Sequence, residues 1–399
     1  MHDADVGRDA LFDTIDWTDA TPLRPGESRF EFLNRSASNF VRPIRELLQE
    51  WLDHVPADAR PDLVGALRGD DRQHESAFWE LYLHEGFRRS GYEIELHPEI
   101  PGIASRPDFR MSDGTTRFYL EAVSVGETPR AIGEERRLQE VDRVLDELVI
   151  ENFTLSMEHS EIGPRSPATR KLRSDLIAWT QGLDPDAVAR GVTVTDLAFD
   201  SLPAFPWCHD GWRLAFRAIP YAPAARGTPH RAVGVKGPAE AVMVDNVTPI
   251  RRVLDKKYGR YGELDAPLVI AVQSNTKIPT HDYQVKHALY GLTPLAPTDP
   301  NLKPSDFFDD GFWLTRAGWR RSNCPQVITI YELSPLTVIS VAPRAWSTLE
   351  PGVRPVALPG WIRPMIMGKD AQPGEGLDVA THFGVDADGL AADPDFHSS

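Results

Sequence analysis

Cysteine and long hydrophobic runs are scarce in this chain of 399 residues. Its two cysteines, Cys208 and Cys324, are too few for a disulfide framework. The longest apolar stretches, 267–272 and 336–343, are less than half of the roughly 20 residues that a membrane-spanning helix needs. The N-terminus is acidic and lacks the apolar segment of a secretory signal. We therefore expect a cytoplasmic protein without a membrane partner.

Several common catalytic and binding motifs are also missing. The sequence contains no Walker A loop, no G-x-G-x-x-G after a predicted strand and no G-x-S-x-G elbow. Cys208-His209 and His230 offer too few ligands at the usual spacing for structural zinc. The composition, with 26% charged and 41% hydrophobic residues, is typical of a globular protein and excludes a disordered or coiled-coil chain.

The formal net charge of −16 argues at first against a polyanionic partner. This charge is unevenly distributed, because residues 1–28 carry −5 and residues 371–399 carry −6. The stretch 165–260 carries +6. We predict that the two ends are flexible acidic segments, and the basic stretch keeps nucleic acid among the candidate partners.

The apolar periodicity changes along the first half of the chain. Steps of three and four residues predict helices over 40–54, 73–90 and 134–150. Alternating and β-rich segments predict strands over 92–97, 106–111, 116–125 and 153–157, with a hairpin turn at 112–114. From the second helix onward, the order helix, three strands, helix, strand predicts one α/β unit of roughly 90 residues.

The second half is predicted to continue as an α/β elaboration. Helices are expected over 168–179, 247–258 and 281–290, and strands over 213–220, 268–273, 326–331 and 336–341. The predicted organisation is an acidic arm (1–28), an N-terminal helix with a core (29–160), a C-terminal elaboration that is basic in 165–260 (161–370), and an acidic tail (371–399).

Two carboxylates in the predicted hairpin form the strongest candidate site. Asp108 follows Pro107, and Glu121 comes on the next strand, across the turn at 112–114. Carboxylates on adjacent strands of a tight hairpin can converge on one hard cation such as Mg²⁺. A bound Mg²⁺ lowers the pKa of a water ligand and neutralises charge on a phosphate group.

This pattern resembles the PD-(D/E)xK, or restriction-endonuclease-like, nuclease superfamily. The matching stretches are the helix from His74 to Glu85, Arg106-Pro-Asp-Phe109, and Tyr119-Leu-Glu-Ala-Val123. The same run, ELYLHE…HP…RPDF…YLEA, is also similar to that of a group of bacterial proteins. The resemblance implies a restriction-endonuclease-like α-β-β-β-α-β core, with N-terminal helices before it and the C-terminal α/β elaboration after it.

The resemblance also implies roles for individual residues. Asp108, Glu121 and the carbonyl group of Ala122 correspond to the metal ligands, and Glu80 corresponds to the outer ligand carried by the helix. Glu75 on the same helix is an alternative to Glu80. The implied cofactor is Mg²⁺ or Mn²⁺.

One position departs from the family pattern, because Val123 stands where the superfamily has a lysine. That lysine orients or deprotonates the attacking water, and some members take the basic group from a neighbouring element. The candidates are Lys171, Lys256 and Lys257, with Gln139 as a residue that could hold a water; we take Lys256 as the catalytic one. An amine within about 4 Å of both carboxylates would favour an enzyme over an inactive fold.

The basic stretch supplies the candidate nucleic-acid-binding residues. They lie on two predicted helices and are Arg170, Lys171, Arg173, Arg251, Arg252 and Lys257. The alternative is a pair of ordinary amphipathic helices with basic outer faces.

The leading hypothesis is a Mg²⁺-dependent nuclease that hydrolyses DNA, with RNA not excluded, in restriction, repair or defence against mobile DNA. It could act as a homodimer or as a partner subunit of a defence system. The alternative is a catalytically inactive nuclease-fold module that binds nucleic acid or another protein.

Overall fold

The chain folds into two units, and the second is inserted in the sequence of the first. The computed structural model describes residues 10–24, 26–126, 129–191, 201–228, 230–231, 246–276, 279–291, 310–367 and 371–385. The chain divides into unit 1, Met1–Gly126 with Asp245–Ser399, and unit 2, Glu127–Val244. The second unit is therefore an insertion in the sequence of the first, and the predicted boundary at residue 160 falls within it.

Unit 1 is built on a mixed sheet of eight strands in the order β1-β2-β3-β9-β12-β13-β14-β15. β1, β2 and β3 form an antiparallel meander, and β9 pairs in parallel with both β3 and β12. This confirms the predicted mixed α/β class. The strands are β1 Glu93–Leu96, β2 Phe109–Ser112, β3 Arg117–Val125, β9 Leu268–Ser274, β12 Gln326–Tyr331, β13 Arg344–Ser347, β14 Arg363–Ile366 and β15 Gln372–Pro373.

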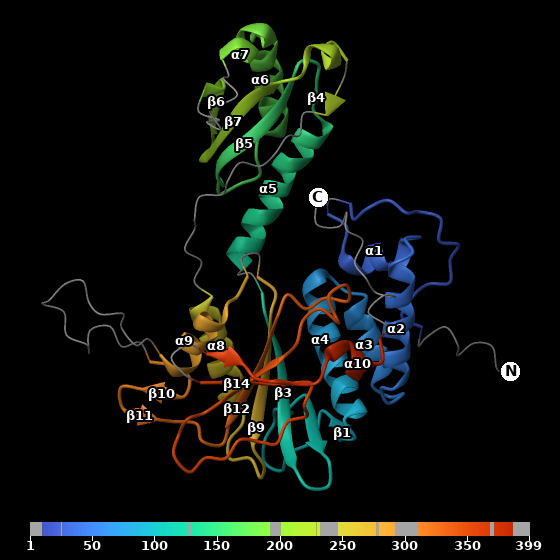
Figure 1. The fold of residues 1–399 in the computed structure, drawn as a ribbon, viewed down its shortest axis with the longest axis vertical. Coiled ribbons are helices and arrows are strands. Elements are labelled where there is room, and N and C mark those ends of the chain that lie inside the picture. The colour runs from blue at the N-terminus through green and yellow to red at the C-terminus, as the bar shows by residue number, and fades with distance from the viewer. Residues whose placement is uncertain are drawn as a thin grey trace, which may run out of the picture. The chain divides into compact units, whose positions relative to one another are not determined.

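Helices cover both faces of this sheet (Figure 1). One layer contains α1 Arg29–Arg35, α2 Val41–Asp53, α3 Arg60–Leu67, α4 Asp71–Arg89 and α10 Val379–Phe383, which confirms the predicted N-terminal helices. α8 Val247–Tyr258 and α9 Asp282–Tyr290 pack with the opposite face. Two short strands, β10 Leu314–Thr315 and β11 Gly318–Trp319, form a separate pair.

The alternation of side chains along β3 decides what the site contains. Phe118, Leu120 and Ala122 belong to the core on the α4 side, whereas Tyr119 and Val125 belong to the core on the α8 side. Because successive side chains of a strand point to opposite faces, Glu121 is directed to the α8 side, where it is fully buried. The strand therefore places a carboxylate under a helix that carries lysine and arginine.

α4 is anchored at its start and packed along its length. Asp70 caps it in a capping box with Gln73, and Trp79 donates a hydrogen bond of 3.0 Å to the Ala271 carbonyl oxygen in β9. Near the C-terminal end, Gly86 lies so close to the Trp361 ring that a Cβ atom would overlap it. These contacts fix the position of the α4 residues relative to the sheet.

Unit 2 has its own sheet and core. β6 Ala204–His209 and β5 Phe153–Glu161 pair antiparallel with the central β7 Trp212–Pro220. Its core includes Leu172, Leu176, Trp207 and Phe216. The remaining elements are α5 Pro129–Glu147, β4 Val149–Ile150, α6 Thr169–Gln181, α7 Pro185–Gly191, the 3₁₀ helix η2 Pro223–Ala225 and β8 His230–Arg231.

One predicted grouping of elements and one predicted strand are wrong. The helix over 134–150 and the strand over 153–157 exist as α5 and β5, but β5 pairs with β7 and not with the sheet of β1, β2 and β3. On the side away from β2, the neighbour of β3 is β9. All seven residues of β9 are buried, as is typical of a central parallel strand. Periodicity indicates the type of an element and not its partner. The predicted strand at 336–341 instead forms turns.

The described parts of the two acidic ends, which the sequence predicts to be flexible, instead pack on the helices of unit 1. Leu11 is fully buried and its backbone N–H donates a hydrogen bond of 2.9 Å to Gln49 Oε1 of α2. The Phe383 ring of α10 packs in a tilted arrangement against Trp51 and Tyr82, with ring centroids 4.9 and 4.7 Å apart. Residues 1–9, 25 and 386–399 of the predicted flexible ends lie outside the described residues. Within the described part of the chain, no helix is long and apolar enough to span a membrane.

Candidate functional site

Asp108 and Glu121 are held together by the backbone of β3. Asp108 directly precedes β2, and its Oδ2 accepts a hydrogen bond of 2.7 Å from the backbone N–H of Ala122. Because Ala122 follows Glu121 on β3, this bond ties the loop carboxylate beside the strand carboxylate. The predicted convergence of these two acidic residues is what the structure contains.

Lys257 of α8 contacts both carboxylates. Its Nζ forms an ion pair with Glu121 Oε1 and lies 3.9 Å from Asp108 Oδ2. Only 14% of the Lys257 side chain is exposed, so the pair is largely shielded from water. A charge pair in such a position is much less screened than one on the surface. A basic group is therefore present within reach of the two carboxylates.

Two further residues after α8 complete the surroundings of Glu121. The Tyr261 hydroxyl donates a hydrogen bond of 2.6 Å to Glu121 Oε2, and Arg260 Nη1 lies 3.5 Å from Glu121 Oε1. Burial, together with the adjacent Glu121, raises the pKa of Tyr261. The phenol therefore keeps its proton and remains a donor, which fixes the orientation of the Glu121 carboxylate.

Glu80 is the α4 residue that interacts electrostatically with Asp108, Glu121 and Lys257. Burial, together with the charges of Asp108 and Glu121, raises its pKa to about 8 against the opposing effect of Lys257. Burial and the charge of Glu121 likewise raise the pKa of Asp108 to about 6, against the opposing effect of Lys257. The negative charges of Glu80, Asp108 and Glu121 repel one another beside Lys257 and Arg260, and protonation of Glu80 or a bound cation would lessen this repulsion.

The donor set fits a hard divalent cation. Asp108 and Glu121 supply carboxylate oxygens from adjacent strands, and Ala122 supplies a carbonyl oxygen next to Glu121. Mg²⁺ takes one or two carboxylates together with waters, and Mn²⁺ accepts the same oxygen ligands. The raised pKa values of Asp108 and Glu80 arise first from burial and then from the neighbouring carboxylates, so a bound cation would stabilise the charged forms of both residues.

The other predicted basic residues lie elsewhere. Lys256 is exposed on α8, since consecutive helical residues are about 100° apart, and the structure places Lys257 instead beside the carboxylates. Lys171 forms an ion pair of 3.0 Å with Asp175 within α6. Gln139 lies on α5 of unit 2.

The remaining acidic residues of α4 have other partners. Glu75 forms an ion pair of 2.7 Å with Arg29, so Glu80 is the α4 carboxylate that interacts with the pair. Glu85 lies near Glu50 and His54, a group with metal-ligand geometry, but Arg88 and Arg89 already pair with Glu85. Two arginines provide the positive charge that a metal would contribute there.

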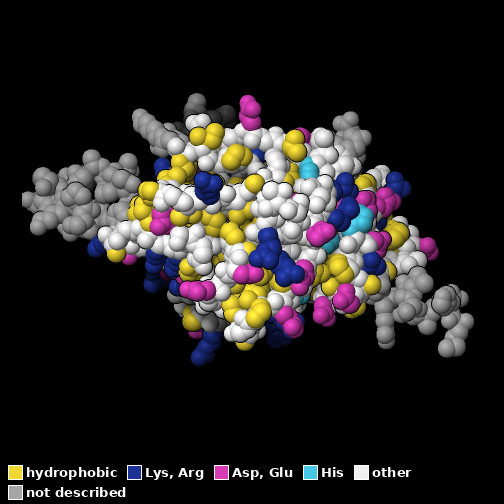
Figure 2. All heavy atoms as spheres, turned by 90° about the horizontal axis from the view of Figure 1, so that it is seen from below, with side chains coloured by type: hydrophobic (Ala, Val, Ile, Leu, Met, Phe, Trp, Pro, Cys, Tyr) yellow, Lys and Arg dark blue, Asp and Glu magenta, His cyan; other side chains and the backbone are white. Residues whose placement is uncertain are grey.

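The predicted nucleic-acid-binding residues are split between the two units. On α6, Arg170 is exposed and Arg173 forms an ion pair of 2.5 Å with Glu147. On α8, Arg252 is exposed and Arg251 Nη1 donates a hydrogen bond of 2.6 Å to the Asp310 carbonyl oxygen. On the face that Figure 2 shows, basic and acidic side chains of the described residues are interspersed.

His97 is a neighbour of the site that the sequence reasoning missed. Its backbone has a left-handed φ of 47°, and its N–H donates a hydrogen bond of 2.9 Å to the Asp108 carbonyl oxygen. A non-glycine residue in this conformation costs about 1–3 kcal/mol and persists where surrounding contacts impose it. The only signal in the sequence is its place between β1 and Pro98.

The raised pKa of Glu80 predicts a dependence of stability on pH. The folded chain binds this proton up to about pH 8, whereas an unfolded glutamate releases it near 4.5, so stability falls as the pH rises between these values. Glu80→Gln removes this effect. We expect the metal-free variant to melt with the wild type near pH 5 and a few degrees above it beyond pH 8.

Thermal unfolding in the presence of a chelator checks this prediction. Glu46→Gln on α2 is the matched control, since Glu46 is exposed, and its difference from the wild type should not change with pH. A constant difference for Glu80→Gln, or one that shrinks as the pH rises, would contradict the pKa assigned to Glu80.

Comparison with protein-family models, with curated proteins and with solved structures finds no match to this chain. The geometry of the site therefore carries the functional argument by itself.

Proposed function

We propose that this protein is a nuclease that hydrolyses DNA phosphodiester bonds and depends on Mg²⁺ or Mn²⁺. The observation that carries this proposal is the contact of Lys257 with both Glu121 and Asp108. The motif lysine that Val123 replaces on β3 is thereby supplied by α8. A shielded amine beside two carboxylates favours the enzyme over the inactive fold.

The element order supports a PD-(D/E)xK-like core with an insertion. In this interpretation the core is α4-β1-β2-β3-α8-β9, and unit 2 is inserted between β3 and α8. Glu80 on α4, Asp108 directly before β2 and Glu121 on β3 follow the order of the superfamily, and β9 pairs in parallel with β3 as the last strand of that core. The lysine alone has moved, from β3 to the helix that follows the insertion.

Each residue then has a chemical task. Asp108, Glu121 and the Ala122 carbonyl would hold the cation, which lowers the pKa of a bound water and neutralises charge on the phosphate. Lys257 binds the attacking water or the phosphate oxygen on which charge develops, and Tyr261 keeps Glu121 in position. Glu80 accepts or releases a proton as the charge at the site changes.

The basic residues of α8 extend this site toward a polyanion. Arg252 and Lys256 are exposed on the same helix as Lys257 and are suited to phosphate contacts. Restriction, repair or defence against mobile DNA are the processes that such a nuclease would serve, as a homodimer or beside a partner subunit.

A cleavage assay tests the proposal. The purified full chain is incubated with supercoiled plasmid, single-stranded DNA and RNA, each with Mg²⁺, with Mn²⁺ or with a chelator. We expect nicked or linear DNA only with a metal ion. Binding of DNA without any cleavage would support the alternative of an inactive module, and products formed in the chelator would contradict the metal-dependent mechanism.

A further inference from the structure

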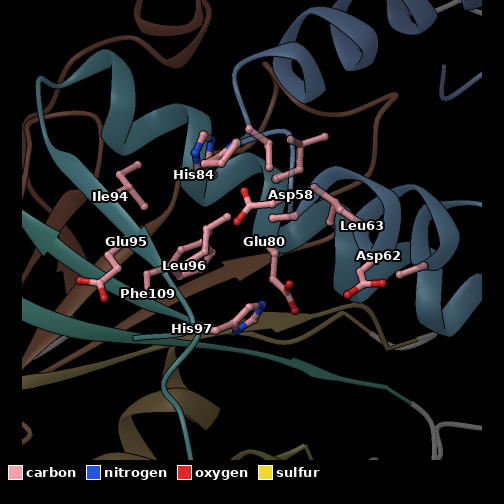
Figure 3. A pocket seen from close by; sticks show the side chains of 15 residues that line it. Asp58, Asp62, Leu63, Glu80, His84, Ile94, Glu95, Leu96, His97 and Phe109 are labelled. Carbon is pink, nitrogen blue, oxygen red and sulfur yellow. The ribbon is translucent and has the colours of Figure 1, made fainter. Parts of the chain in front are cut away.

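A cavity of about 580 Å³ opens next to the carboxylate site. It lies among α3, the segment before α3, α4 and β1, and Figure 3 shows Glu80 and His97 pointing toward one another at its base. Glu80 therefore belongs to both the cavity and the surroundings of Asp108. Phe109, which follows Asp108, and His97, whose N–H bonds to the Asp108 carbonyl oxygen, also line the cavity, so a group that fills it lies beside Asp108.

The walls of the cavity are apolar and its rim is acidic. Leu63, Ile94, Leu96 and Phe109 form much of the wall. Asp58 and Asp62 are exposed at the rim, and Figure 3 shows the Asp58 carboxylate directed into the space. The described residues that line it include no lysine or arginine. An apolar wall beside carboxylates disfavours phosphate and suits an apolar group that carries N–H donors.

The histidines do not reverse this preference. Burial lowers the pKa of His84 to about 4, so it is a neutral imidazole at neutral pH. His97, which is exposed at the wall, offers a ring face on which a planar group can stack, whereas Phe109 is only 2% exposed. Glu95, also at the wall, forms an ion pair with Arg110 and is therefore less available to a ligand.

We propose that this cavity receives an unpaired guanine of the strand that the carboxylate site cleaves. The inference rests on the proposed nuclease function, since a base is covalently linked to the phosphate held at Asp108 and Glu121. Asp58 or Asp62 accepts the two N–H donors on the Watson–Crick edge of guanine, as an enzyme reads an extruded base. Thymine has one such donor between two carbonyl groups, which a carboxylate repels.

Single-stranded DNA is the direct substrate for a test, because its bases enter a pocket without the cost of unpairing. Two end-labelled strands are compared with Mg²⁺, an oligothymidine and the same strand with one central guanine. We expect cleavage next to the guanine to be about tenfold faster than at the same position in oligothymidine, as one pair of base hydrogen bonds allows. Inosine, which lacks the amino group, should lose part of this preference.

Variants link the preference to the cavity. The double substitution Asp58→Asn with Asp62→Asn, and separately Ala66→Trp, which fills the cavity, should bring the ratio of the two rates toward one. Glu93→Gln is the control, because Glu93 is an exposed acidic residue of β1 outside the cavity lining, and its ratio should equal that of the wild type. Melting temperatures identify any variant that fails to fold.

The outcomes separate the two proposals. Metal-dependent cleavage at equal rates on both strands overturns the guanine pocket and leaves the nuclease function intact. No cleavage and no binding of either strand overturns the nuclease function and the pocket with it. If cleavage shows no base preference and an arginine-rich peptide raises the melting temperature of the protein, the cavity would bind a basic protein partner. That outcome also overturns the inference.

Discussion

Asp108→Asn is expected to reduce metal-dependent cleavage by about a thousandfold. A carboxylate ligand contributes to cation binding and charge stabilisation on the scale of several kcal/mol, which corresponds to a factor of this size. The substitution keeps the fold, because the asparagine oxygen can still accept the hydrogen bond from the Ala122 N–H. Single-turnover cleavage of plasmid with saturating protein and Mg²⁺ measures the effect.

Two further variants sharpen this test. Glu121→Gln should show a loss of similar size, but it also leaves the shielded Lys257 without its ion pair, so its melting temperature must be measured in parallel. Asp113→Asn in the β2–β3 turn is the matched control, since Asp113 is exposed and interacts with Tyr92, Thr115 and Thr116 and not with the residues of the site. Undiminished cleavage by both Asp108→Asn and Glu121→Gln would contradict the assignment of these ligands.

Lys257→Ala is expected to slow cleavage by about a hundred- to a thousandfold, whereas Lys256→Ala should have little effect on the rate. A positioned basic group contributes about 10²–10⁴ to such a reaction. The two lysines are neighbours on one helix with the same charge, but only Lys257 contacts Glu121 and Asp108. The comparison therefore separates position from net charge.

Binding measurements complete the comparison of the two lysines. DNA affinity is measured by fluorescence anisotropy of labelled DNA, with Ca²⁺ in place of Mg²⁺. The affinity should fall by a similar, small factor in both variants, since each loses one positive charge. Equal losses of cleavage in the two variants would mean that α8 acts through its charge alone. Full activity of Lys257→Ala would contradict the catalytic role assigned to the Lys257 amine.

Much of the core could be predicted from local patterns. The alternation over 116–125 and the turn at 112–114 define a hairpin, and a hairpin fixes the register between its strands. Asp108 and Glu121 are close because of this local geometry. The sequence leaves Glu75 and Glu80 as alternatives for the outer ligand on the helix. The structure distinguishes them, because Glu75 forms an ion pair with Arg29.

The remaining parts depend on contacts that are distant in the sequence. Lys257 is 136 positions from Glu121, and unit 2 separates them in the chain. No local spacing decides between Lys256 and Lys257, because the packing of α8 on the sheet determines which of them is shielded. In the same way, β5 has the pattern of a strand that could have joined β3, and only its pairing with β7 reveals the insertion.

A crystal of the full chain soaked in Mn²⁺ tests the central claim most directly. We predict an anomalous peak for a manganese ion about 2.0–2.2 Å from a carboxylate oxygen of Asp108 and from one of Glu121. The Ala122 carbonyl oxygen would be a third ligand, and Lys257 would lie beside a water on the metal. An empty position there, with Lys257 still paired to Glu121 and the manganese bound elsewhere, would contradict the account.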